Sequence, residues 1–213
     1  MSAKRTAIAA TLAFAAGFAA AHTATDGFEA YTLESARRLQ ALRAPVSVPN
    51  LVLELADGGR VSLSGAPGRV LLVDFIYTNC PTFCTALGSV YAQLKQRLAA
   101  EIARGDVRLV SVTFDPEHDG AGELRAYRAR FSADPEGWML GRPVRAGDLQ
   151  GWLNAFGVVV IPDGVGGYAH NAAVHVLGAD RRLVAIHDLE DIDGIVQATR
   201  EAITGNNRHV AAR

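Results

Sequence analysis

The chain has 213 residues, 49% of them hydrophobic, and its 21 lysines and arginines nearly balance its 22 aspartates and glutamates, giving a net charge of −1. After removal of a targeting segment, this length fits one domain of ordinary size with a full hydrophobic core. The sequence holds no basic block, which argues against nucleic acid as a partner.

The N-terminal segment is expected to direct the protein out of the cytoplasm. Lys4 and Arg5 precede an uncharged, alanine-rich run, residues 6–21, that ends in three alanines. This pattern is typical of a secretory signal peptide. The alternative is an uncleaved anchor, although the run falls a little under the roughly 17–25 residues of a spanning helix. We therefore expect residues 1–21 to be a signal peptide or N-terminal membrane anchor. The location would be the periplasm or the outer face of the inner membrane if the source is bacterial.

The next elements lead into the main domain. Residues 22–48 are interpreted as a linker or tether with a short surface helix within residues 28–43. A β-hairpin is then predicted from LVLEL and RVSLS, residues 51–64, because Asp57 and Gly58 supply the turn between them.

Strands and helices alternate through the rest of the chain. Strands are predicted at 70–77, 107–114, 138–140, 172–178 and 182–188, helices at 80–104, 123–131, 148–157 and 191–203, and a glycine-rich loop at 161–171. This order predicts an α/β fold, a thioredoxin-like sandwich with a central mixed sheet flanked by helices and an N-terminal β-hairpin extension. The domain is expected at residues 49–205, followed by a C-terminal tail, 206–213.

Cys80 and Cys84 are the only cysteines, and they fall between an apolar strand and an amphipathic helix. If residues 80–84 are helical, both sulfurs project from one face. Their Cα atoms then lie within the separation of about 4.4–6.8 Å that a disulfide accepts. N–H groups at a helix start favour the thiolate. Such a pair suits disulfide exchange, peroxide reduction or binding of a soft cation such as Cu(I). The alternative is a structural disulfide or two buried thiols.

Three histidines are candidates for a third metal ligand. His170 ends the glycine-rich loop, which in a thioredoxin-like sheet faces the start of the cysteine helix, so it can approach both sulfurs. His175 lies on a different level and face of the next strand and is interpreted as a core residue. His187, and also His118, are expected at the surface. Two thiolates and an imidazole suit Cu(I), and Cu(II) could add oxygen ligands, whereas a closed structural zinc site usually takes four ligands.

Three motifs in order resemble the SCO/SenC family. They are VDFIYTNCPTFC, then SVTFDPEHD, then a histidine ten residues before the aspartate of a hairpin turn, His170 to Asp180. The likeness runs from about Pro49 to Ile203. It implies an exported, usually membrane-tethered, thioredoxin-like protein that binds copper and helps to assemble the binuclear copper centre of cytochrome c oxidase.

Carried over residue by residue, the resemblance makes Cys80, Cys84 and His170 the copper ligands. Asp115 would lie near the site without being a ligand. The implied partners are the copper-bearing subunit of the oxidase and a copper donor protein. Thr85 stands where the family often has proline. Ala169-His170-Asn171 stands where it often has Asp-His-Ser, which removes one candidate partner for the imidazole.

Delivery of copper is therefore the first functional hypothesis. The alternative is a thiol–disulfide oxidoreductase in which Cys80 and Cys84 reduce the cysteines of a client protein. Peroxidase chemistry is less favoured, because it needs one low-pKa nucleophile with a basic neighbour, and no arginine lies close in the Cys80 stretch.

Overall fold

The structure is a computed structural model that describes residues 3–63, 69–80, 83–131, 136–164 and 166–211, without the side chains of 83–84 and 206–211. The chain forms two compact units, Met1–Arg43 and Ala44–Arg213. The first unit ends within the segment that the sequence predicted as a tether.

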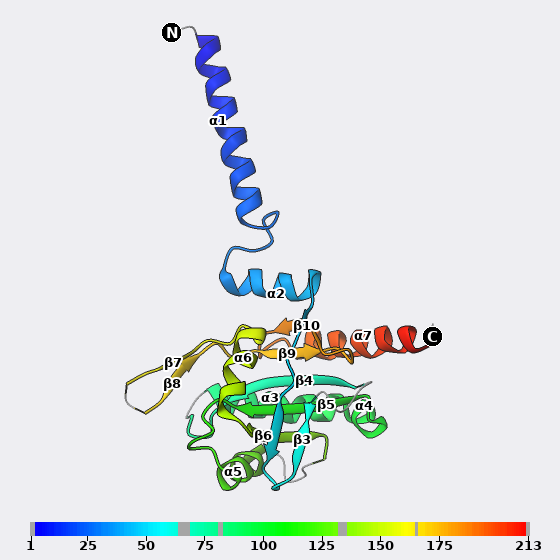
Figure 1. The fold of residues 1–213 in the computed structure, drawn as a ribbon. Coiled ribbons are helices and arrows are strands. Elements are labelled where there is room, and N and C mark those ends of the chain that lie inside the picture. Colours follow the sequence, from blue (N-terminus) through cyan, green and yellow to red (C-terminus); the bar gives the residue numbers. More distant parts are fainter. Residues whose placement is uncertain (1–2, 64–68, 81–82, 132–135, 165, 212–213) are drawn as a thin grey trace. The chain divides into compact units, whose positions relative to one another are not determined.

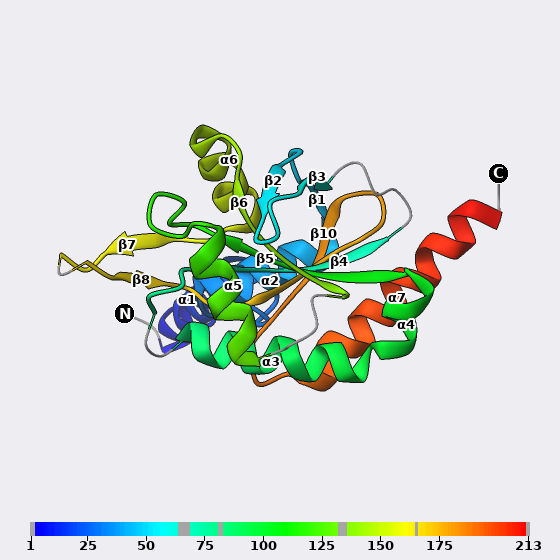
Figure 2. The same cartoon turned by 90° about the horizontal axis from the view of Figure 1, so that it is seen from below.

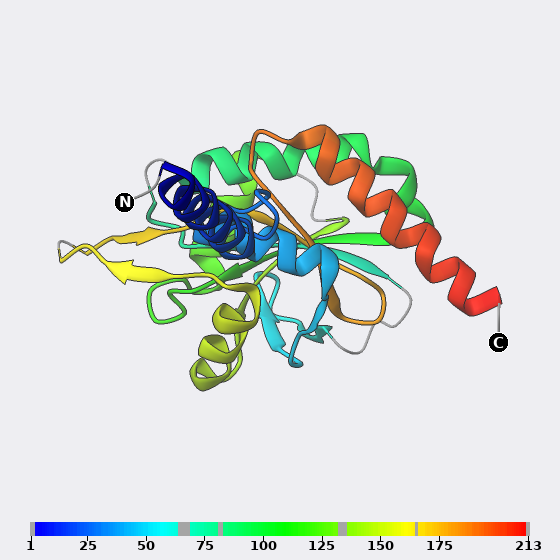
Figure 3. The same cartoon turned by 90° about the horizontal axis from the view of Figure 1, so that it is seen from above.

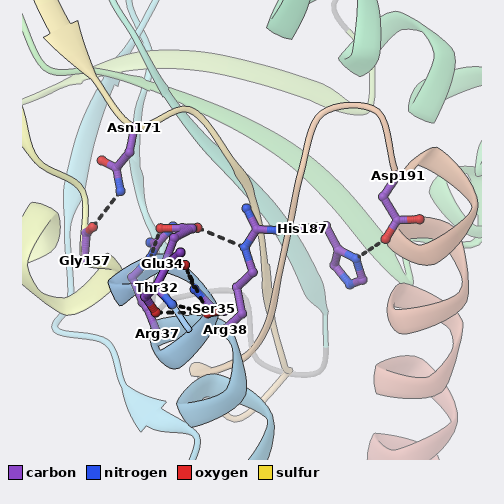
Figure 4. Close-up of polar contacts among 9 residues, drawn as sticks. All are labelled: Thr32, Glu34, Ser35, Arg37, Arg38, Gly157, Asn171, His187 and Asp191. Atoms are coloured by element: carbon purple, nitrogen blue, oxygen red, sulfur yellow. Dashed lines mark hydrogen bonds and ion pairs between the residues drawn. The ribbon is translucent and has the colours of Figure 1, made fainter. Parts of the chain in front are cut away.

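The N-terminal unit consists of two helices (Figure 1). α1, Ala3–Ala24, is exposed along its length, and by length and composition it could cross a membrane, as a signal sequence also could. α2, Leu33–Arg43, starts at a reciprocal cap in which Thr32 and Ser35 each accept the other's backbone N–H through the side-chain oxygen. Glu34 pairs with two arginines one turn later (Figure 4). α1 fits the expected signal peptide or anchor.

An eight-stranded mixed sheet forms the centre of the second unit, in the order β1-β10-β9-β4-β5-β6-β2-β3. β4, β5 and β6 run parallel, and all other neighbours are antiparallel. The strands are β1 Val46–Ser47, β2 Val52–Leu55, β3 Arg60–Ser62, β4 Val70–Ile76, β5 Val107–Thr113, β6 Trp138–Pro143, β9 Val174–Leu177 and β10 Arg182–His187. β2 and β3 are the predicted hairpin, which extends the sheet beyond β6.

Helices cover both faces of this sheet. They are α3 Phe83–Arg97, α4 Ala99–Arg104, α5 Ala121–Phe131, α6 Ala146–Phe156 and α7 Ile192–Ala211. α3 and α7 lie on one face, where α3 also packs against α5, and α6 lies on the opposite face (Figures 2 and 3). The predicted thioredoxin-like α/β sandwich is confirmed.

The core lies on both sides of β4, all of whose residues are buried. On the α6 face, the Phe156 ring meets Phe75 at a centroid distance of 5.2 Å and His175 at 5.1 Å. His175 is 1% exposed, and its Nδ1 lies 3.0 Å from the carbonyl oxygen of Val73. The interpretation of His175 as a core residue is therefore confirmed.

The prediction of a glycine-rich loop over residues 161–171 is wrong in part, because the two ends of this segment form a second, two-stranded sheet. β7, Val160–Pro162, pairs with β8, Tyr168–His170. The Asp163 N–H donates to the carbonyl oxygen of Gly167 and closes the hairpin. Gly164 and Gly166 take the positive φ angles that the turn requires, so these glycines serve a hairpin turn and not a loose loop. The hairpin projects from one end of the sheet (Figure 2).

Two further segments are more ordered than the sequence indicated. Val46 and Ser47, within the predicted tether, form β1 and pair with the start of β10. The segment expected as a tail is helical as far as Ala211. In addition, the cysteine helix predicted to run to Arg104 is divided into α3 and α4 at Leu98, and α4 ends at Gly105 with a φ of 78°.

Candidate metal centre

Cys80 lies four residues beyond the carboxyl end of β4, in the segment that leads to α3. Its side chain is 6% exposed. Cys84 is in the first turn of α3, but its side chain lies outside the described part of the structure. The backbone therefore agrees with a strand–cysteine–helix arrangement, while the distance between the two sulfurs stays a prediction.

His170 ends β8 and lies on two aromatic rings. Its imidazole centroid is 5.0 Å from the Phe114 ring and 6.3 Å from the Tyr77 ring. Tyr77 directly follows β4, and Phe114 directly follows β5. Because β4 and β5 are parallel, these rings share one edge of the sheet, the edge from which the chain runs to Cys80. The structure thus brings His170 to the edge where the cysteine segment begins.

The environment of His170 favours the neutral imidazole. Burial lowers the pKa of His170, and the hydrogen bond with the Asn171 backbone offsets this only in part. A neutral imidazole keeps a nitrogen lone pair for a metal ion, whereas a protonated ring has none. The chemistry of this side chain therefore fits a ligand of a soft metal site.

Tyr77 also holds the hairpin that carries His170. Its ring lies 5.2 Å from that of Tyr168, and its hydroxyl oxygen is 3.5 Å from the Tyr168 backbone nitrogen. Sequence reasoning did not identify Tyr77 as part of the site, although it stands three residues before Cys80 in the FIYTNC segment.

Asp119 fixes the segment that leads to Cys80 through hydrogen bonds. Sequence reasoning did not identify this residue either. Its carboxylate accepts the backbone N–H of Thr78 at 3.0 Å and the hydroxyls of Thr78 and Thr113. It thereby ties the residues before Cys80 to the end of β5. Burial raises the pKa of Asp119, and the threonine hydrogen bonds oppose this shift. The sequence signal that could have pointed to Asp119 is its place as the second aspartate of the DPEHD segment.

Asp115 lies beside this segment, as the family resemblance implied. Together with Asn79 and Tyr168 it lines a cleft of about 520 Å³. Burial and then the Asp115 carboxylate raise the pKa of Tyr168. His118, whose Nδ1 is 2.8 Å from Asp115, is 75% exposed, as expected. The hydrogen bond that the His118 ring donates to the Asp115 carboxylate raises the pKa of His118.

The described side chains do not by themselves assemble a metal site. Among them, no three His, Cys, Asp or Glu side chains are close enough to hold an ion. The predicted triad needs the sulfur of Cys84, which is outside this set.

His187, expected at the surface, is 19% exposed and bonds to Asp191 ahead of α7 (Figure 4).

Comparison with known proteins identifies relatives of most of the second unit. The chain is 28% identical over 160 residues to the SCO1 protein homolog of Bacillus subtilis (strain 168), covering 73% of this chain and 79% of that protein. The fold is similar to that of BsSco, with a TM-score of 0.66 and 25% identity, over 76% of this chain and 95% of BsSco. BsSco is described as a member of the Sco family of cytochrome c oxidase assembly proteins with a disulfide switch.

A second similar structure is Arabidopsis thaliana ScoI with copper bound, with a TM-score of 0.61 and 20% identity, over 73% of this chain and 99% of that chain. The family model described as SCO1/SenC matches residues 48–204, nearly the whole of the sheet and its helices. By this match, which spans most of its length, the chain belongs to the SCO1/SenC family.

Proposed function

We propose that this protein binds copper through Cys80, Cys84 and His170 and delivers it to the copper-bearing subunit of cytochrome c oxidase. The observation that carries the proposal is the position of His170 on the Tyr77 and Phe114 rings, at the sheet edge that leads to Cys80. The relatives support it, because BsSco is an oxidase assembly protein and copper is bound to the Arabidopsis ScoI.

Copper is the cargo in this proposal, and the residues of the chain hold and release it. Two thiolates and one neutral imidazole offer three soft or borderline donors, which suit Cu(I). Burial lowers the pKa of His170 and so favours the neutral imidazole. The N-terminus of α3 stabilises negative charge in the cysteine segment. A copper donor protein would load the site.

The localisation proposed from the sequence belongs to the same account. α1 would direct or anchor the copper-binding unit at the outer face of a membrane, where oxidase assembly needs it.

The test is an anaerobic titration of the reduced full chain, in detergent, with Cu(I) in competition with a chelator of known affinity. We expect one copper per wild-type chain. His170→Ala should weaken binding by more than the roughly 10- to 100-fold that loss of an outer-shell partner costs. His118→Ala is the matched control, because the His118 side chain is exposed and bonds to Asp115, and it should bind like wild type. Equal affinity of the wild type and the His170→Ala variant would contradict the proposal.

A second candidate function is reduction of client disulfides by Cys80 and Cys84. The position of both residues at a strand–helix junction favours it, and a disulfide switch is described for BsSco. This function needs no histidine ligand. Thiol exchange that survives in His170→Ala, together with copper binding that does not depend on His170, would make the reductase the better account.

A further inference from the structure

The residue after His170 makes an unusual pair of contacts. Asn171 does not continue the β7–β8 ladder, whose last pair is Val160 with His170. Its side chain instead bonds to the backbone where the chain leaves α6. Asn171 Oδ1 accepts the Val159 N–H at 2.7 Å. Asn171 Nδ2 donates to the carbonyl oxygen of Gly157 at 3.0 Å, the bond drawn in Figure 4.

These two hydrogen bonds attach Asn171 to the end of α6, which is packed against the sheet. Gly157 ends α6 in the left-handed conformation, with a φ of 65°. α6 buries Trp152, Leu153 and Phe156 against the sheet. A carbonyl group at a helix end has no partner within the helix, and Asn171 supplies one. The amide therefore links the histidine strand to a helix end that is anchored in the core.

The far side of the hairpin has much weaker support. The Ile161 side chain is 57% exposed, and among the described residues β7 and β8 form a two-stranded sheet separate from the central one. Backbone freedom in this hairpin would move the imidazole relative to the cysteine segment. Asn171 ties the base of both strands to the body of the domain directly beside His170, while Tyr77 contacts the hairpin through Tyr168 and His170.

We infer that Asn171 is a positioning residue for the copper site, acting through His170 by fixing the base of the β7–β8 hairpin. This inference rests on the proposed function. Asn171 stands where the family often has serine. The inference therefore rests on the two hydrogen bonds that Asn171 makes in this chain and not on the family resemblance. An asparagine side chain offers both a donor and an acceptor, and the site uses both.

The test is a double-variant cycle on the reduced full chain, with Cu(I) affinity as the readout. Asn171→Ala should weaken binding about 10- to 100-fold, as loss of an outer-shell partner does. In the His170→Ala background, Asn171→Ala should cause no further change, because its effect passes through the imidazole. Asn154→Ala is the matched control: Asn154 is exposed on α6 and bonds to Gln150, so affinity should be unchanged.

Thermal unfolding of each variant separates positioning from general damage. We expect Asn171→Ala to remain folded over the range of the titration. An equal loss of affinity in both backgrounds would overturn the inference, because Asn171 would then act without His170. Wild-type affinity in Asn171→Ala, with a loss in His170→Ala, would overturn the inference but leave the proposed function standing. Wild-type affinity in His170→Ala would count against the proposed function itself.

Discussion

Asp74→Asn should make the second unit more stable, and the gain at pH 5 should be less than half of the gain above pH 7. Asp74 is fully buried in the middle of β4, and burial raises its pKa from 3.8 to about 7. The hydroxyls of Ser111 and Tyr91 face the carboxyl and lower its pKa less than burial raises it. Among the described residues, neither carboxyl oxygen has a hydrogen bond of good geometry. We therefore take desolvation to dominate.

The direction in which the free energy of unfolding changes with pH follows from the number of protons that each state binds. Between pH 4 and 7 the folded chain keeps a proton on Asp74 that the unfolded chain has lost, so the free energy of unfolding falls as pH rises. A pKa raised from 3.8 to about 7 corresponds to a loss of about 4 kcal/mol, complete above pH 7. Asparagine cannot ionise and avoids this loss.

The measurement is urea unfolding at pH 5 and pH 8.5, followed by the fluorescence of the two buried tryptophans, Trp138 and Trp152. Asp57→Asn is the control, because Asp57 lies at the β2–β3 turn and asparagine keeps its side-chain acceptor for Gly59. Its pH profile should parallel that of wild type. A loss of stability in Asp74→Asn at pH 8.5 would show that the buried carboxylate is stabilised as an anion.

Tyr77→Ala should have the second large effect, on both stability and copper affinity. The Tyr77 side chain is 4% exposed, and its ring contacts those of Phe114, Tyr168 and His170. Truncation of a buried aromatic residue to alanine costs about 3–5 kcal/mol. It would also remove a ring on which the imidazole rests, so Cu(I) affinity should fall toward that of His170→Ala.

Tyr77→Phe separates the ring from the hydroxyl. The Tyr77 hydroxyl is 3.5 Å from the Tyr168 nitrogen, a long contact, so its removal should cost about 1 kcal/mol or less. Copper affinity should stay near wild type. Urea unfolding and chelator competition measure the two quantities. A folded Tyr77→Ala chain with wild-type copper affinity would show that the ring does not support His170.

Local periodicity was sufficient to predict most of the fold. The run at β4 reads as a buried strand because it is continuously apolar apart from Asp74. The β2–β3 hairpin has a clear turn signal. The β7–β8 hairpin was missed because its strands have only three residues each and its glycines resemble those of a loop.

The support of the site could not be predicted, because it depends on contacts between distant segments. Asn171 bonds to residues 12 and 14 positions earlier, and Asp119 bonds to Thr78 across 41 positions. No periodic pattern encodes such pairs. The ligand candidates themselves follow from residue type, spacing and family resemblance, so His170 could be named as a candidate, whereas the side chains that contact it could not.

The central claim is that the chain carries copper to the oxidase, and a transfer assay tests it most directly. The copper-loaded full chain is mixed with the copper-free, fully reduced copper-bearing subunit, in the presence of a chelator that removes free copper. We predict that the subunit takes up copper with the loaded wild-type chain as the sole copper source, measured as the copper bound to the subunit after the two proteins are separated. If the subunit takes up copper only when free copper is supplied, and the copper-free reduced chain accelerates this uptake solely with an oxidised subunit, the protein is a reductase and the account is wrong.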